Sequence, residues 1–163
     1  MNRIVIHWTA GGHQPNNEDY QHYHFMINKD GLKINGKYKP EDNLDCSKSG
    51  KYAAHTGGGN TGSIGIAMCG MAGFKNRNNV GKYPLTAKQV ESCFKEVAKL
   101  CKQYKIKVTP YTVFTHYEFG LRNPNTTSKG KIDIIYLSSY PNMPANKIGD
   151  FIRNKVIWYL DKV

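Results

Sequence analysis

Two histidines and one aspartate stand where predicted strands end, and their side chains are of the types that bind zinc. The run Tyr111–Thr115 has the β-branched and aromatic composition of a strand; it leads to His116, and a polar loop then continues to Asp133. His7 lies near the end of a second predicted strand, Arg3–Trp8. A catalytic zinc takes three protein ligands and keeps one position open. These residues predict such a site, with His7 as the best candidate for the third ligand.

Other residues with similar chemistry are less suited to the metal. A histidine on its own is more often structural than a ligand, because a strand-end imidazole can simply satisfy a backbone carbonyl. His22 and His24 flank Tyr23, and strand alternation points both away from the side that Tyr23 uses. His13 lies in a predicted loop and is not a candidate ligand. Cys69 offers a thiolate and stays an alternative ligand.

The order of these residues along the chain resembles a known enzyme family. It is similar to the zinc N-acetylmuramoyl-L-alanine amidases, which include phage endolysins, bacterial cell-wall recycling amidases and the animal peptidoglycan recognition proteins. The similarity spans residues 4–133. It is carried by His7 in IVIHWTAG, Tyr23 in HYHFMINKDG, the strand SIGIAMCG, His116 and the pair Lys131-x-Asp133.

The resemblance implies a specific reaction and a role for each site residue. One Zn²⁺ would be bound by His7, His116 and Asp133, and the enzyme would hydrolyse the amide bond between the lactyl group of N-acetylmuramic acid and L-alanine. The metal would lower the pKa of its water from ~15.7 to about 7, and the resulting hydroxide would attack the lactyl carbonyl. Tyr23 and Lys131 would be the catalytic residues that stabilise charge on the tetrahedral oxygen.

Each catalytic residue also has an ordinary interpretation. Taken alone, Lys131 is a solvated loop lysine and Tyr23 is a core aromatic, and the resemblance favours function for both. Some recycling members of the family carry a glutamate on the central strand, where this chain has Ala67. The missing carboxylate places the chain nearer to the phage lysozyme branch, which relies on the tyrosine and the lysine.

A glycine-rich segment supplies the predicted substrate contacts. Residues 53–60 read AAHTGGGN, and the resemblance places this loop at the rim of the groove. We therefore predict His55 and Thr56 as substrate-binding residues. The three glycines do not form a phosphate-binding loop, because no Gly-Lys-Ser/Thr sequence follows them.

Hydrophobic periodicity and turn residues predict one α/β domain over residues 1–163. Thr86 and Gln89 form a capping-box pattern ahead of a helix with one apolar stripe, and a second long helix is expected at 145–161. A single helical turn is expected at 18–22. Strands and helices in this order predict a mixed central β-sheet flanked by helices on both sides. The expected strands are 3–8, 23–28, 32–34, 63–69 and 111–115.

The net charge of +11, from 23 Lys and Arg against 12 Asp and Glu, favours polyanionic partners. The lysines are spread along the chain without a nucleic-acid motif, so an anionic cell envelope is expected in place of nucleic acid. The four cysteines form no C-x-x-C pair and are expected to be buried thiols. No apolar run reaches the length of a membrane span, and no signal peptide is evident. We therefore expect the protein to be made in the cytoplasm and to act on the wall after release. We also expect it to be a monomer.

Several functions agree with these observations. The main hypothesis is a zinc amidase of a phage or prophage endolysin acting on peptidoglycan. A cytoplasmic amidase that recycles muropeptides is the second, and a peptidoglycan-binding module without catalysis is the third. The complete ligand set and Lys131 argue against the third, because a pure binder has no use for an open metal site.

Overall fold

A five-stranded mixed sheet forms the centre of the protein. The computed structural model describes residues 1–163. The strands lie in the order β3-β2-β4-β1-β5; β2 and β3 are antiparallel, and the other neighbours are parallel. Their bounds are Arg3–Trp8 (β1), Phe25–Ile27 (β2), Lys33–Asn35 (β3), Ser63–Met68 (β4) and Val113–Thr115 (β5).

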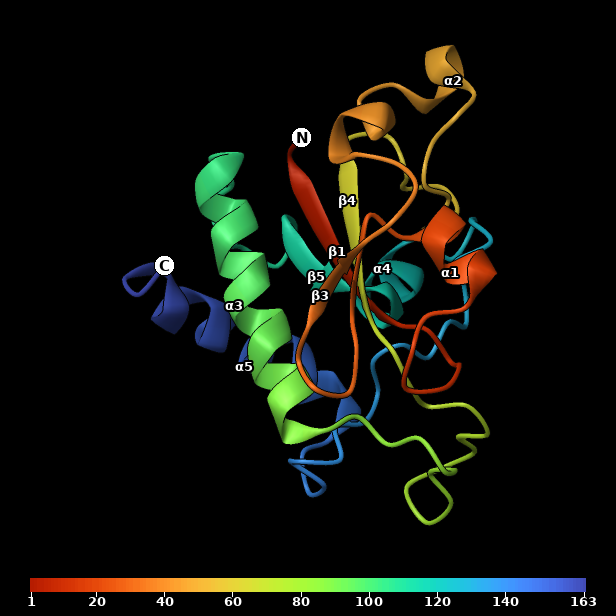
Figure 1. Ribbon diagram of the computed structural model, residues 1–163, viewed down its shortest axis with the longest axis vertical. Helices are drawn as coiled ribbons and strands as arrows, with labels where there is room; N and C mark the ends of the chain where they lie inside the picture. Colours follow the sequence, from red (N-terminus) through yellow and green to blue (C-terminus); the bar gives the residue numbers. More distant parts are fainter.

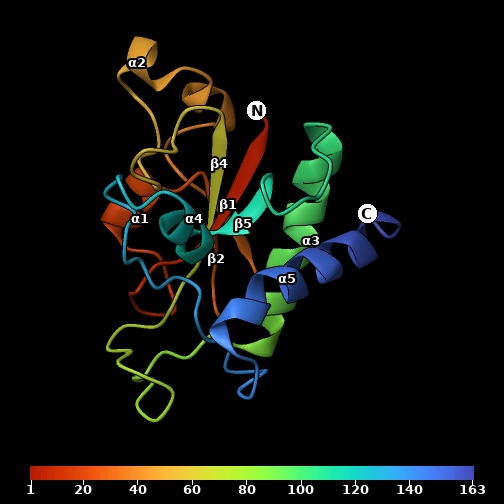
Figure 2. The same cartoon turned by 180° about the vertical axis from the view of Figure 1, so that it is seen from behind.

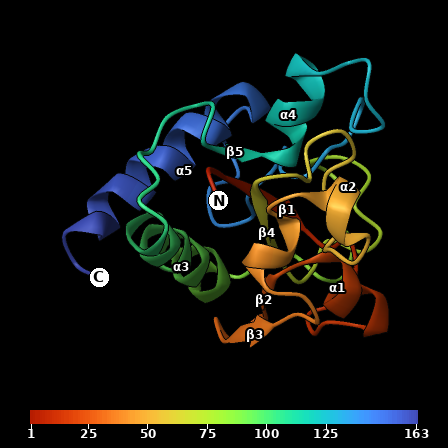
Figure 3. The same ribbon diagram turned by 90° about the horizontal axis from the view of Figure 1, so that it is seen from above.

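Helices cover both faces of this sheet, which confirms the predicted α/β architecture. The two long helices, α3 and α5, pack against each other on one side, and the short helices α1 and α4 lie on the other (Figures 1, 2 and 3). A 3₁₀ turn at Pro40–Asn43 precedes α2. The helices are Asn17–His22 (α1), Cys46–Ser49 (α2), Ala87–Gln103 (α3), His116–Arg122 (α4) and Ala145–Leu160 (α5).

The alternation of β1 divides its side chains between two environments. Ile4, Ile6 and Trp8 join the main core of 24 buried residues, together with side chains of α3 and α5. Val5 faces the other side and packs with Phe114 and Phe119 in a smaller cluster. Because side chains two apart share a face, His7 points to the same side as Val5, which is the side covered by α4.

The N-terminus of α3 is fixed to the ends of two strands. Thr86 and Gln89 form the predicted capping box, each accepting the backbone N–H of the other at 3.1 Å. The buried Gln89 amide also donates to the carbonyls of Ile27 and Cys69. One side chain therefore caps the helix and anchors it at the carboxyl ends of β2 and β4.

The helix α4 was not predicted, since the residues after His116 were expected to form a polar loop. Thr115 accepts a hydrogen bond from Glu118 N–H, and the Glu118 carboxylate accepts one from Thr115 N–H. This capping box starts a helix directly at the end of β5, so that His116 is its first residue. The strands β2 and β5 are shorter than predicted, with three residues each.

An ion pair ties α5 to the junction between β5 and α4. Arg153 is buried, and its guanidinium donates two hydrogen bonds of 2.9 Å to the Glu118 carboxylate. The same group donates to the carbonyl of Val113 at 3.0 Å. The helix on the far side of the sheet thus holds in place the turn that carries His116.

The four cysteines are free thiols, and Cys69, Cys93 and Cys101 are buried as expected. None of the helices combines the length and the apolar composition needed to cross a bilayer.

Candidate metal centre

Three donor atoms converge beyond the carboxyl end of β1. Asp133 Oδ2 lies 2.8 Å from His7 Nδ1 and 3.3 Å from His116 Nδ1. The ligand atoms all lie within 4.8 Å of one another, and the three side chains are buried. The two imidazole rings have centroids 4.7 Å apart. Residues far apart in the sequence are therefore placed as one compact set of possible metal ligands.

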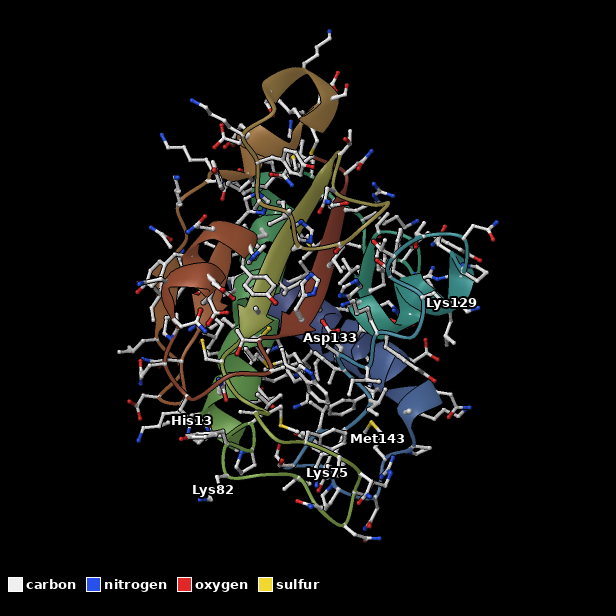
Figure 4. The ribbon with its side chains drawn as sticks, turned by 90° about the vertical axis from the view of Figure 1, so that its right-hand side faces the viewer. His13, Lys75, Lys82, Lys129, Asp133 and Met143 are labelled. Atoms are coloured by element: carbon white, nitrogen blue, oxygen red, sulfur yellow. The ribbon has the colours of Figure 1, made fainter.

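Each donor is positioned by a different element. His7 lies near the end of β1 and pairs in register with Ala67 of β4. His116 begins α4, directly after β5. Asp133 returns from the long loop after α4, and its carbonyl accepts the Tyr117 N–H at 2.6 Å. Figure 4 shows Asp133 near the middle of the molecule beside the end of β1, whereas Lys129 of the same loop lies at the periphery.

The local electrostatics put His7 and Asp133 in the forms that bind metals. Burial lowers the pKa of His7 to about 4, against the raising effect of Asp133, so the imidazole is neutral at pH 7. Burial would raise the pKa of the Asp133 carboxyl, but the contacts with His116 and His7 outweigh it and hold that pKa below its usual value. Metal ligands must be neutral imidazole and ionised carboxylate. Two nitrogens and one carboxylate oxygen suit zinc.

Two of the three donors, His116 and Asp133, line a cavity of about 570 Å³. Tyr23 and Lys131 both line it, as do Trp8 and Phe74. Asp133 is the sole acidic residue in the lining, and Ala67, fully buried, adds no carboxylate. The open side of the site is therefore aromatic and basic, and it leaves space for a substrate next to the donors.

Tyr23 and Lys131 differ in their surroundings. The Tyr23 ring centroid lies 5.2 Å from that of His7. Burial raises the pKa of the Tyr23 phenol, and the charge of Asp133 raises it further, so the hydroxyl stays protonated and can donate. Lys131 is exposed, and its ammonium forms no salt bridge within the chain. Its charge is free to meet an anion or a developing oxyanion in the cavity.

His55 and Thr56 lie deeper than a groove rim. His55 lines the cavity but is 6% exposed, and Thr56 is 0% exposed. The His55 ring contacts His7 Nε2, which is the nitrogen pointing away from Asp133, at 3.2 Å. That position excludes His55 from the donor set. The predicted substrate contacts of His55 and Thr56 stay predictions, and Thr56 has no exposed surface with which to make one.

The remaining candidates lie outside the cluster. His24 is buried in a polar network and accepts the N–H of Gly65 at 2.9 Å. His13 bonds to a backbone carbonyl, and His22 bonds to another at the cavity edge. Burial raises the pKa of the Cys69 thiol to about 12, which keeps it neutral. Cys69 is not part of the donor group.

One known protein family matches most of the chain. The family described as N-acetylmuramoyl-L-alanine amidase matches residues 1–131. The chain belongs to this family. The match includes His7, Tyr23, His116 and Lys131 but ends before Asp133, so the third donor of this chain is assigned by the geometry.

Solved structures resemble this chain at low sequence identity. The N-acetylmuramoyl-L-alanine amidase LysC from Clostridium intestinale URNW is 20% identical, with a TM-score of 0.49 over 77% of this chain and 75% of its own. The ectodomain complex of the peptidoglycan recognition proteins LCa and LCx with tracheal cytotoxin is 20% identical, with a TM-score of 0.49 over 79% of this chain and 76% of its own. Drosophila peptidoglycan recognition protein SD is 18% identical, with a TM-score of 0.49 over 78% of this chain and 74% of its own. A comparison with curated protein sequences gives no significant match.

Replacing Asp133 tests the donor set. Asp133→Ala leaves two histidines, and we expect it to retain little zinc after dialysis, whereas Asp133→Cys should retain the metal because zinc accepts thiolate as well as carboxylate. Metal per protein, measured by mass spectrometry of the elements, reports both. Asp19→Asn, which changes another buried carboxylate, is the matched control and should keep its zinc. Full zinc binding by Asp133→Ala would show that another residue, first of all Cys69, is the ligand.

Proposed function

We propose that this protein is a zinc-dependent amidase that hydrolyses the bond between the lactyl group of N-acetylmuramic acid and L-alanine in peptidoglycan. The observation that carries the proposal is the buried cluster of His7, His116 and Asp133, of which His116 and Asp133 line a cavity. Membership of the N-acetylmuramoyl-L-alanine amidase family supports the same substrate and bond.

Lys131 and Tyr23 are proposed to stabilise the charge that develops during the reaction. When bound, zinc supplies a Lewis acid and makes water a nucleophile near neutral pH. Lys131 brings a positive charge to the side of the cavity where the carbonyl oxygen gains negative charge. Tyr23 offers a phenol that stays protonated and can donate to the same oxygen. Because Asp133 is the sole carboxylate of the lining, the leaving amine must receive its proton without help from a second acidic residue.

A peptidoglycan-binding module is the alternative from another class. A binder needs a groove but no open metal site, and it needs no cation placed next to one. The neutral imidazole of His7, the ionised Asp133 and the unpaired ammonium of Lys131 support hydrolysis in preference to binding alone.

For the biological setting we propose a phage or prophage endolysin that reaches the wall once the membrane has been opened. The net charge of +11 supports this setting, because it would concentrate the enzyme on an anionic envelope. A cytoplasmic enzyme that recycles muropeptides is the second candidate, supported by the same site. We propose that the chain acts as a monomer.

Digestion of purified peptidoglycan tests the proposed reaction. We expect new free amino groups on L-alanine and no new reducing sugar ends, since the amide is cut and the glycan is not. A zinc chelator should abolish the release, and added zinc should restore it. A binding module would sediment with the wall and release nothing with or without metal, and a glycosidase would create reducing ends.

Two substitutions distinguish zinc binding from catalysis. Tyr23→Phe and Lys131→Ala should keep full zinc content, because neither side chain belongs to the donor set. Each should lower kcat on the order of 10²–10³-fold with a smaller change in KM, since each removes a donor needed in the transition state. The double variant should lose less than the product of the two losses, because both donors serve one oxygen.

Lys129→Ala is the matched control for these variants, since Lys129 is exposed in the same loop and does not line the cavity. It should hydrolyse peptidoglycan at the parent rate. A zinc-loaded Lys131→Ala that is as fast as Lys129→Ala would remove Lys131 from the mechanism.

A further inference from the structure

The nitrogens of the two ligand histidines that point away from Asp133 are held by other side chains. His116 Nε2 lies 2.9 Å from Ser128 Oγ, and His7 Nε2 lies 3.2 Å from His55 Nδ1. Ser128 is fully buried and His55 nearly so. These contacts come from two loops, residues 55–60 and 126–128, that meet behind the metal centre.

The contact between Ser128 Oγ and His116 Nε2 determines which nitrogen of His116 carries the proton. Ser128 Oγ also lies 2.7 Å from the carbonyl oxygen of Gly57, which can only accept. The single hydroxyl hydrogen is therefore donated to Gly57, and the oxygen is left to accept from His116. His116 then has its proton on Nε2, and its Nδ1 carries a free lone pair.

A similar sequence of contacts fixes His7. His55 Nε2 faces the carbonyl of Ser63 at 3.3 Å and must donate to it, so His55 Nδ1 is an acceptor. The single lone pair of that nitrogen accepts from Thr56 Oγ at 2.7 Å, so the Thr56 oxygen is left to accept from His7 Nε2, which lies 3.4 Å away. His7 is therefore the donor through Nε2, and its Nδ1 also carries a lone pair.

The two rings consequently lack a proton on the side of Asp133. An imidazole that binds a metal through one nitrogen carries its one N–H on the other nitrogen, and in each ring that N–H is used on the outer side. Both Nδ1 lone pairs then face the Asp133 carboxylate at 2.8 and 3.3 Å, an arrangement that needs a cation among them. The outer hydrogen bonds thus make the centre complementary to a metal ion.

Glycines allow the two outer contacts to form. A Cβ atom at Gly65 would lie 2.4 Å from His55 Cγ, so the His55 ring rests directly on the backbone of β4. A Cβ atom at Gly57 would lie 1.8 Å from Thr127 Oγ1, so only glycine lets the two loops meet there. The glycine-rich segment is therefore a packing surface for the loop that carries Ser128.

We propose that Ser128 and His55, with Thr56, are positioning residues that hold both ligand histidines in the Nε2–H tautomer and thereby preorganise Nδ1 for zinc. This inference rests on the proposed zinc site and deepens it. It gives His55 and Thr56 a role behind His7 in place of the substrate contact that the glycine-rich loop suggested. Outer partners of this kind typically change metal affinity by about 10–100-fold.

Zinc affinity of Ser128→Ala tests the proposal. Competition with a chromophoric chelator should show zinc binding weakened by about 10–100-fold relative to the parent. Ser138→Ala is the matched control, because it also removes a buried serine hydroxyl. Unlike that of Ser128, the Ser138 hydroxyl has no hydrogen-bond partner. It should bind zinc as the parent does. A folded Ser128→Ala variant that binds zinc as tightly as the parent would overturn the role of Ser128.

Nitrogen-15 NMR of the imidazoles in the zinc-loaded parent gives a second readout that needs no variant. We expect the proton on Nε2 of both His7 and His116, with slow exchange, and we expect Ser128→Ala to speed the exchange of the His116 proton alone. A proton on Nδ1 of either ring would overturn the proposal, even if Ser128→Ala fails to fold. Zinc held in the expected tautomers by a protein that leaves peptidoglycan intact would instead remove the proposed function.

Discussion

The buried carboxylate of Asp133, shared by the Nδ1 atoms of two histidines, is the interaction on which the structure of the site depends. A carboxylate that is 7% exposed is costly unless charges or hydrogen bonds compensate it. Because the Nδ1 lone pairs of His7 and His116 face it, the compensation would come from a cation bound by all three groups. The two histidines reach this point from β1 and from the start of α4. The fold is therefore constrained to bring the carboxyl ends of β1 and β5 and the loop after α4 together.

Much of the rest of the molecule holds this arrangement rigid. Arg153 of α5 reaches through to Glu118 and Val113 and fixes the turn before His116. On the other side, the close packing of Gly57 against the 126–128 loop places Ser128 against His116 Nε2. A metal centre requires such support because small displacements of its ligands weaken binding. The exposed, unpaired Lys131 lies on the opposite, open side, where a substrate can enter.

The sequence predicted those parts of the fold that depend on local patterns. Strand alternation in β1 placed His7 apart from Ile4 and Ile6, and the Thr86–Gln89 pattern marked the start of α3. The start of α4 had the same kind of signal in Thr115 and Glu118, but a seven-residue helix among loop-forming residues offers little periodicity to detect. On β4, the missing side chain of Gly65 leaves the space that the His55 ring occupies.

The contacts behind the ligands could not be predicted in this way. Ser128 meets the Gly57 carbonyl across 71 residues, and His55 meets His7 across 48. Such pairs leave no local pattern, and a serine in a polar loop looks like any other. Asp133 was placed by resemblance to the family, yet the family match ends before it, and the structure adds the distances that connect it to the histidines.

The most direct test of the account is anomalous diffraction at the zinc edge from crystals grown with one equivalent of the metal. The account predicts a single strong peak about 2.0–2.2 Å from Nδ1 of His7, Nδ1 of His116 and a carboxylate oxygen of Asp133, with its fourth side open to the cavity lined by Tyr23 and Lys131. A peak bound through Nε2 of either histidine, a peak at Cys69, or no peak at the cluster would contradict it.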